Sequence, residues 1–229
     1  MGIRTNKGLL IPAATFLLFA GLTTPALADA PSPEPIVGNS ADAEDTTVQP
    51  GPPAEPEETD LIEVQDPDAP VEGGELPPGK AEPAPGAEHC RPGGVYRPTS
   101  KHGKFHKGVG PTNANYNGTS RTAKSRFEAE VTAKVGISVS AGLKVKASAM
   151  VAEIEQEYSV NLSLELTAKL GNVITVDTPA KKTTHAKYGV YRLKHKGKSY
   201  SYYSNCSTTT KKTITSYTPY RVGWYIWES

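Results

Sequence analysis

Few residues in the sequence have the types and spacing that catalysis or metal binding requires. His102 and His106 lie four residues apart, the spacing that places two metal ligands on one face of a helix. Gly103 and Gly108 disfavour a helix at this point, so we interpret the stretch as a basic loop and predict no metal site. Asp177 has the chemistry to orient a catalytic histidine, but no nucleophile motif lies beside it.

Carboxylate pairs are the second kind of candidate, because glycoside hydrolysis needs two carboxylates flanking the substrate. Such a pair would come from the glutamates of the C-terminal two thirds of the chain: Glu128, Glu130, Glu153, Glu155, Glu157 and Glu165. Alternate charges along a strand form a solvated face, which is the simpler interpretation. The sequence also has no phosphate-binding loop and no dinucleotide-binding fingerprint. We therefore predict that the protein is not an enzyme and uses no cofactor.

The charges of the chain are divided between two parts of opposite sign. Residues 31–88 contain 15 acidic residues and one lysine, whereas residues 89–229 contain 22 Lys and Arg against 8 Asp and Glu. A basic domain accumulates on anionic surfaces, so the predicted partner is an anionic lipid or a cell-wall polymer, without specific recognition of nucleic acid. The residues that we expect to make this contact are lysines and two C-terminal tryptophans: Lys101, Lys104, Lys107, Lys181, Lys182, Lys194, Lys196, Lys198, Lys211, Lys212, Trp224 and Trp227.

The N-terminus has the features of a secretory signal peptide. Arg4 and Lys7 precede an apolar run at residues 9–21, and Ala26 and Ala28 form a small-residue cleavage site. Residues 1–28 are therefore predicted to be removed on export. The mature protein is expected to be secreted and extracellular.

Residues 29–88 are predicted to form a disordered acidic tail or linker before a basic, β-rich domain at residues 89–229. The tail is rich in proline and acidic residues and has few large apolar side chains, so it cannot bury enough surface to offset the entropy of ordering. One short apolar run, residues 61–64, is interpreted as incidental rather than as a docking motif.

Cys90 and Cys206 are the two cysteines of the chain. In an oxidising compartment an even number of cysteines predicts a disulfide. This bond would enclose most of the basic domain and, in the chain-entropy model, contribute up to ~4–5 kcal/mol of stability. Free thiols and an intermolecular bridge are the alternatives.

A long alternation of apolar and polar residues runs through residues 127–170. Odd positions are apolar from Phe127 to Val151, and even positions are apolar after that, which indicates strands with one buried face. A hairpin requires this change of parity, because residues that face each other across an even-numbered loop have opposite parity. We predict strands at 127–145 and 158–170. A short helix or irregular crossover joins them, because the residues between lack turn formers and favour helix.

The remaining parts of the domain complete the prediction of fold. Residues 89–120 have the composition of a basic loop, and residues 171–229 contain short β segments separated by turns, one of them at residues 195–198. The sequence therefore predicts a mostly β protein. It has a single antiparallel β domain with long amphipathic strands and at most one short helix, preceded by the disordered tail.

The alternating strands, the amphipathic turn-back and the Thr- and Tyr-rich β segments after them resemble the aerolysin-type β-pore-forming toxins. The resemblance covers residues 127–184 and implies that the amphipathic segment refolds into a membrane-spanning hairpin of a homo-oligomeric pore. A membrane strand needs about 9–11 alternating residues, and the stretch is long enough. The residues that would then face lipid are Val135, Ile137, Val139, Leu143, Val145, Val160, Leu162, Leu164 and Leu166.

The end of the chain, with the motifs at residues 204–206 and 220–224, is similar to uncharacterised small secreted proteins of actinomycete-like bacteria, a resemblance that implies no activity. The leading functional hypothesis is a secreted, non-catalytic protein that binds an anionic surface through its basic, aromatic-rich β domain. One alternative is a pore-forming or membrane-perturbing protein that uses residues 127–170. A passive extracellular structural or inhibitory protein is the other.

Overall fold

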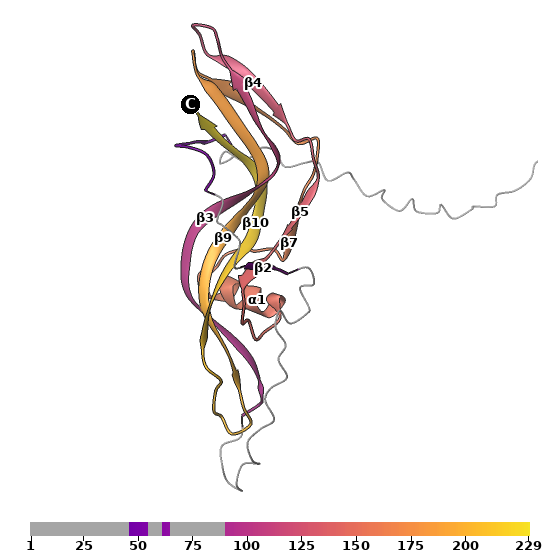
Figure 1. Ribbon diagram of the computed structural model, residues 1–229, viewed down its shortest axis with the longest axis vertical. Helices are drawn as coiled ribbons and strands as arrows, with labels where there is room; N and C mark the ends of the chain where they lie inside the picture. The colour runs from indigo at the N-terminus through magenta and orange to yellow at the C-terminus, as the bar shows by residue number, and fades with distance from the viewer. Residues whose placement is uncertain (1–45, 55–60, 65–89) are drawn as a thin grey trace, which may run out of the picture. The chain divides into compact units, whose positions relative to one another are not determined.

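The computed structural model describes residues 46–54, 61–64 and 90–229 (Figure 1). The predicted signal peptide and most of the predicted tail lie outside the described residues. The described part is mostly antiparallel β-sheet with one short helix. The predicted fold class is therefore confirmed.

Three long strands form the central sheet: β3 (Gly93–Tyr116), β9 (Thr183–Tyr202) and β10 (Lys212–Glu228). β9 lies in the middle and pairs antiparallel with both neighbours over most of its length (Figure 1). The register shifts in β3 between Lys101 and Lys104, and in β10 between Pro219 and Arg221. Such bulges bend a strand and increase its twist, which allows strands of this length to remain paired in a twisted sheet.

Two local predictions are wrong in this sheet. Residues 89–120 were expected to form a loop, but most of them form β3, because β9 offers a continuous partner for their backbone. The turn expected at residues 195–198 is absent, since Gly197 lies within β9. A Cβ atom at Gly197 would lie 2.3 Å from Cζ of Tyr96, so this glycine provides room for a buried ring.

Short strands extend the sheet beyond β10. β6 (Ser138–Ser140) pairs antiparallel with β10, and β2 (Leu61–Glu63) pairs antiparallel with β6. β1 (Val48–Gln49) pairs parallel with the C-terminal part of β10. Because β1 and β2 belong to residues 29–88, the prediction of a tail without structure is wrong for these two pieces, and the run at residues 61–64 is not incidental.

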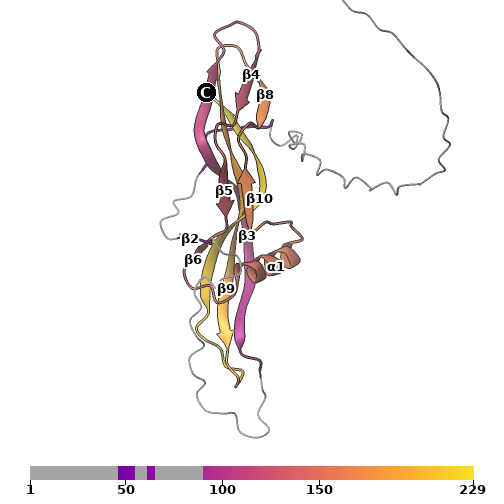
Figure 2. The same cartoon turned by 90° about the vertical axis from the view of Figure 1, so that its right-hand side faces the viewer.

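A two-stranded ribbon lies beside the long sheet. β4 (Ala123–Glu128) pairs with β8 (Val173–Thr178), and β5 (Ala133–Gly136) pairs with β7 (Glu165–Ala168), both antiparallel. The ribbon lies to the right of the long strands in Figure 1 and faces the viewer in Figure 2. Along the chain, the ribbon connects β3 and β9 of the central sheet to the residues between β5 and β7.

The helix α1 (Ala147–Tyr158) occupies the crossover, so of the two forms expected there, a short helix or an irregular stretch, the structure has the helix. The prediction of two long strands at residues 127–145 and 158–170 is wrong in extent. These residues instead form parts of four shorter strands, β4, β5, β6 and β7. Gly142, with φ +101°, turns the chain away from β6. Residues 159–164 then return from the helix to β7 without forming a strand.

Two apolar clusters pack on the central sheet. In the first, the ribbon contributes Phe127, Val135 and Ile174, which pack with Tyr188 and Trp224 of the long strands. The second cluster contains α1 and β6 together with residues of β3 and β10: Tyr96, Ile137, Val139, Leu143, Ala147, Met150, Val151, Ile154 and Ile214. The chain between β5 and β7 therefore begins and ends at the first cluster and is buried against the second.

The predicted disulfide is present between Cys90 and Cys206, whose Cα atoms are 5.0 Å apart. It joins the residues before β3 to the turn between β9 and β10, and the N–H of Cys90 also donates to the carbonyl of Ser204 (3.0 Å). The bond lies at one end of the long sheet. It therefore restrains the three long strands and not the crossover between β5 and β7.

We predict that replacing both cysteines, Cys90→Ser with Cys206→Ser, lowers the free energy of unfolding by about 4 kcal/mol, because the unfolded chain loses the closure of a loop with a sequence separation of 116. Urea unfolding of the variant and of the parent protein measures the difference. An unchanged free energy of unfolding would show that the bond does not stabilise the domain.

Candidate functional site

The ribbon keeps one register through both of its strand pairs. Ala123 pairs with Thr178 and Glu128 with Val173 in the first pair, and Ala133 pairs with Ala168 in the second. The stretches that connect the two pairs, 129–132 and 169–172, have equal lengths. Hydrogen bonds also cross this gap, for example from the Ala129 N–H to the carbonyl of Asn172 (2.8 Å). β4–β5 and β7–β8 are therefore the two arms of one hairpin stem.

The stem stops at Gly136 and Glu165, although the alternating sequence continues. Residues 137–164, which we call the insertion segment, form β6, α1 and the two stretches that flank α1. Most large apolar residues of its first arm pack inward: Ile137, Val139, Leu143 and Met150 are buried, as is Ala147, whereas Ala141 and Ala149 are exposed. The amphipathic surface of this segment is hidden against the central sheet.

The nine residues expected to face lipid all contribute to the two clusters. Val135 is buried in the first cluster and Leu166 packs against it. Ile137, Val139 and Leu143 are buried in the second cluster. Val145, Val160, Leu162 and Leu164 are half-buried and pack against the second cluster. The structure thus brings these side chains together as interior residues.

The helix α1 has few local features that stabilise it. Its N-cap, Lys146, makes no side-chain capping bond, and its last turn has no basic residue. Glu155 and Glu157 instead place negative charge near the negative end of the helix dipole. An isolated helix of 12 residues is marginal in water. The helix is therefore held mainly by its packing on the sheet.

A few polar contacts attach the insertion segment to the long strands. The Lys144 N–H donates to Oγ of Ser199 (2.8 Å), and the Thr215 N–H donates to Oγ of Ser140 (2.9 Å). The Ser163 N–H donates to the carbonyl of Pro219 (2.7 Å), which the bulge of β10 leaves available. Apart from the β6–β10 pairing, these are single bonds rather than a ladder. The segment can leave the sheet without breaking the β3–β9–β10 pairing.

The central sheet presents a second feature on the face that α1 does not cover. Lys194, Lys196 and Lys198 alternate along β9 and therefore point to one side. Their register partners on β10 are Tyr217, Thr215 and Thr213, and Lys198 also pairs with Arg97 on β3. We call Arg97, Lys194, Lys196, Lys198 and Lys211 the basic face.

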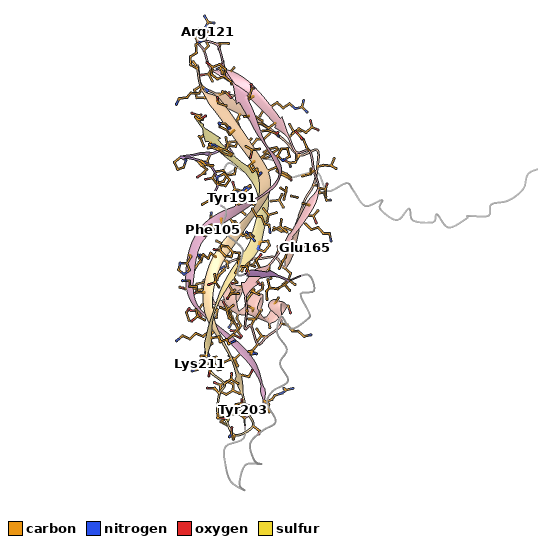
Figure 3. The ribbon with its side chains drawn as sticks, in the orientation of Figure 1. Phe105, Arg121, Glu165, Tyr191, Tyr203 and Lys211 are labelled. Atoms are coloured by element: carbon orange, nitrogen blue, oxygen red, sulfur yellow. A yellow bond between two sulfur atoms is a disulfide. The ribbon has the colours of Figure 1, made fainter. Side chains whose placement is uncertain are left out.

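Aromatic rings separate the cations of the basic face. Nζ of Lys194 lies 5.6 Å from the ring centre of Phe105 and 5.4 Å from that of Tyr217. Nζ of Lys211 lies 4.8 Å from the ring centre of Tyr200, and Figure 3 labels Phe105 and Lys211 on this sheet. Nε of Arg97 donates to the hydroxyl of Tyr200 (3.1 Å). Cation–π contacts hold the positive charges in place without neutralising them.

The other predicted surface residues lie elsewhere. Lys101, Lys104 and Lys107 lie on β3, Lys181 and Lys182 lie in the turn before β9, and Lys212 begins β10. Trp224 and Trp227 are only 2% and 8% exposed, and Nε1 of Trp224 donates to Oδ1 of Asn172 (2.7 Å). The prediction that these tryptophans contact an external surface therefore does not agree with the structure, in which they are core residues.

The glutamates that could have formed a catalytic pair are dispersed. Glu128 and Glu130 line a pocket of about 710 Å³, where Glu128 lies 3.9 Å from the Arg126 guanidinium. Glu165 forms an ion pair with Lys134 (3.0 Å), and Glu155 accepts a bond from the Leu162 N–H (2.7 Å). Within the described residues, no group of three or more His, Cys, Asp or Glu side chains is arranged to hold a metal ion.

Two buried histidines were not recognised in the sequence as titratable core residues. His106 contacts the rings of Tyr191 and Tyr225, and its Nε2 donates to the carbonyl of Gly223 (3.2 Å). His195 stacks on Tyr158 of α1, and neither of its ring nitrogens has a hydrogen-bond partner among the described residues. The pKa of each is lowered to about 4, mainly by burial, and nearby Lys101 and His102 contribute to the lowered pKa of His195.

These pKa values predict a loss of stability in acid. Each histidine has a pKa near 6.5 in the unfolded chain and about 4 in the folded protein. The unfolded state therefore binds more protons below pH 6.5, and stability falls as the pH decreases from about 6.5 to about 4. For His106 the loss is roughly 3 kcal/mol.

Urea unfolding at pH 7, 5 and 4 tests this prediction. The double variant His106→Gln with His195→Gln is expected to be less stable at pH 7 but to lose less stability between pH 7 and pH 4 than the parent protein does. An equal pH dependence in both proteins would contradict the assignment of the acid sensitivity to these histidines.

Neither the sequence nor the structure of the chain is significantly similar to the known proteins compared with it. No family model matches the sequence, and comparison with curated proteins and with solved structures found no significant similarity. No helix in the described part of the chain is both long and apolar enough to cross a membrane.

Proposed function

We propose that the protein is a secreted membrane-perturbing protein whose insertion segment, residues 137–164, unfolds from the sheet and continues the ribbon as a membrane-spanning β-hairpin. The observation that supports this proposal is the single register shared by β4–β8 and β5–β7. Continuing that register, in which Gly136 faces Glu165, requires no slip of one arm against the other. The hairpin stem of the folded protein thus sets the pairing of the longer hairpin.

The continued register places apolar residues opposite one another. Ile137 would face Leu164, Val139 would face Leu162, and Ala141 would face Val160. Because side chains of facing residues lie on the same side of a hairpin, one face would be apolar along both arms except at Gln156, which would face Val145. The turn would fall at Met150 and Val151, which leaves each arm longer than the 9–11 residues that a membrane strand needs.

The same register places complementary residues on the opposite face. Lys144 would face Glu157, and Lys146 would face Glu155. Cross-strand pairs of opposite charge stabilise a hairpin, whereas like charges at those positions would destabilise it. In the folded protein these charges have no such arrangement, because Lys144 and Lys146 precede α1 while both glutamates lie within it. The charge pattern therefore fits the hairpin better than it fits the helix.

The proposal is also energetically reasonable, because burial in the protein would be replaced by burial in lipid. Residues that leave the second cluster would lose burial in protein but would be covered by lipid instead, while their backbone groups would pair within the hairpin and with neighbouring copies, as a bilayer requires. The long strands and the Cys90–Cys206 bond would remain in place. A homo-oligomer follows from the proposal, because a single hairpin leaves two unpaired edges.

Ala141 provides the sharpest test, because it is exposed in the folded protein but faces lipid in the proposed hairpin. We predict that Ala141→Arg leaves the stability in solution nearly unchanged and abolishes dye release from vesicles. An arginine on the lipid face near the bilayer midplane costs about 2–4 kcal/mol in each hairpin. Dye release from vesicles that contain anionic lipid, together with thermal unfolding, measures both effects.

Asn161→Arg is the matched control for this experiment. Asn161 is also exposed in the folded protein, lies beside the proposed partner of Ala141, and belongs to the wet face of the hairpin. We expect this variant to release dye as the parent protein does. Equal activity of both variants, or equal loss, would contradict the proposed orientation of the hairpin.

The basic face supports a second candidate function, binding to an anionic surface. The three alternating lysines of β9 point to one side of the sheet. The ion pairs made by Lys124, Arg126 and Lys134 lie on the ribbon and not on this face. Each basic residue near an anionic bilayer contributes about 1 kcal/mol. This face would deliver the protein to a membrane, or hold it on an anionic cell-wall polymer if lipid is not the target.

We predict that neutralising Lys194, Lys196 and Lys198 with glutamine weakens binding to anionic vesicles by about 3 kcal/mol, or roughly a hundredfold. Binding of the parent protein should be lost in 1 M salt, where the Debye length is about 3 Å. Lys124→Gln with Lys134→Gln is the control, because Asp177 and Glu165 already pair with these lysines.

Vesicle co-sedimentation measures this binding, and an isolated cell-wall polymer provides a parallel target. Binding to the polymer alone would select the surface-binding function without membrane insertion. Salt-insensitive binding would contradict the electrostatic mechanism. Absence of binding to both targets would leave a protein partner, as expected of a structural or inhibitory protein.

A further inference from the structure

The acidic tail reaches the insertion segment through one short strand. β2, Leu61–Glu63, lies at the edge of the sheet and pairs with β6, which is part of residues 137–164. We propose that β2 is a latch that holds the insertion segment in its folded position and must detach before the hairpin forms. This inference rests on the proposed membrane insertion, but the attachment itself can be tested separately.

The contact between β2 and β6 is specific in its register. Ile62 is the register partner of Val139, and the N–H of Val64 donates to the carbonyl of Ile137 (2.8 Å). Val64 also packs against the second apolar cluster. The backbone approaches closely at Gly136, where a Cβ atom would lie 3.1 Å from the carbonyl oxygen of Val64. Backbone pairing and apolar packing together hold residues 61–64 on the first arm of the segment.

The latch and the hairpin compete for the same backbone. β6 lies between β2 and β10 in the sheet, so both of its hydrogen-bonding edges are occupied. In the proposed hairpin, one edge of residues 137–140 would pair with residues 161–164 and the other would face a neighbouring copy. A strand has only two such edges. Neither edge can serve the hairpin while β2 and β10 are both attached to β6.

The opposite charges of the tail and of the basic face favour release of the latch at an anionic membrane. The part of the chain that contains β2, residues 31–88, carries 15 acidic residues and one lysine, whereas the basic face carries only cations. The negative potential of an anionic membrane attracts the basic face and repels the tail. A surface that binds one state better than the other shifts the equilibrium toward that state. Approach to an anionic membrane would therefore favour detachment of β2.

A second strand of the tail provides a matched comparison. β1 pairs parallel with β10, where Val48 is the register partner of Ile226, and it has no register partner in the insertion segment. Val48 and Ile62 have similar exposure, 45% and 43%. A proline at either position removes a backbone donor from an edge strand. Val48→Pro and Ile62→Pro thus perturb the same tail at two different attachments.

Hydrogen exchange of the full-length mature protein in solution tests the latch without any membrane. We expect Ile62→Pro to accelerate amide exchange in residues 137–143 by about tenfold, and Val48→Pro to leave that region unchanged. A second variant, Val64→Asp, places a charge in the apolar contact and should act as Ile62→Pro does. Cooperative urea unfolding shows that each variant still folds. Unchanged exchange in both latch variants, or equal acceleration by Val48→Pro, would overturn the proposal.

Dye release from vesicles containing anionic lipid then separates the latch from the membrane function. Faster release by Ile62→Pro, with parent-like release by Val48→Pro, supports both. Accelerated exchange without dye release from any variant supports the latch and contradicts the proposed insertion. Dye release by the parent protein that Ile62→Pro does not accelerate, with exchange unchanged, supports insertion and overturns the latch.

Discussion

The backbone pairing of the ribbon is the constraint on which the rest of the structure depends. β4–β8 and β5–β7 share one register, and this register brings Gly136 and Glu165 together at the base of the insertion segment. The residues between Gly136 and Glu165 are therefore inserted at the end of one paired hairpin stem. In the proposed change of conformation both ends of the segment would remain paired, and β3, β9 and β10 would keep their pairing with one another.

The amphipathic sequence satisfies two different environments. In the folded protein the apolar residues of the insertion segment are covered by the central sheet, and the helix α1 uses Met150, Val151 and Ile154 to fill the second cluster. The N-cap of the helix makes no side-chain capping bond and its ends lack favourable charges, so its stability depends mainly on that packing. In a hairpin the same residues would form one apolar face and the lysines and glutamates would pair on the other. Local sequence and tertiary packing thus favour different structures, which is expected where a conformational change is part of function.

The sequence predicted the fold class, the disulfide and the opposite parity of facing residues, because each depends on local pattern or on simple counting. For the crossover it left a short helix and an irregular stretch as alternatives. Val135 does face Leu166, as the change of parity requires. The sequence did not predict β3 or the continuity of β9, because glycine and lysine suggest loops when no partner strand is visible. It also placed Trp224 and Trp227 on the surface, although Trp224 packs with the ribbon in the first cluster and Trp227 packs with the rings of His185 and Tyr225.

The role of residues 61–64 shows a further limit of local pattern. Three apolar side chains in an acidic, proline-rich stretch do not identify a strand, since the pairing partner β6 lies more than seventy positions away. Likewise, the basic face is not evident from the number of lysines alone. Only the alternation of Lys194, Lys196 and Lys198 within one continuous strand places them on one side of the sheet. Both features required the long-range pairing of the structure.

The most direct measurement of the central claim is cross-linking between cysteines introduced at Lys146 and Glu155. In the folded protein α1 separates these positions by about 13 Å along the helix axis, too far for a disulfide, whose Cα atoms lie roughly 4.4–6.8 Å apart. In the proposed hairpin they face each other directly. We expect a disulfide on vesicles containing anionic lipid but not in solution, and a weaker yield for cysteines at Lys146 and Glu157, which are out of register. Failure to cross-link on vesicles that the protein permeabilises would contradict the continued register.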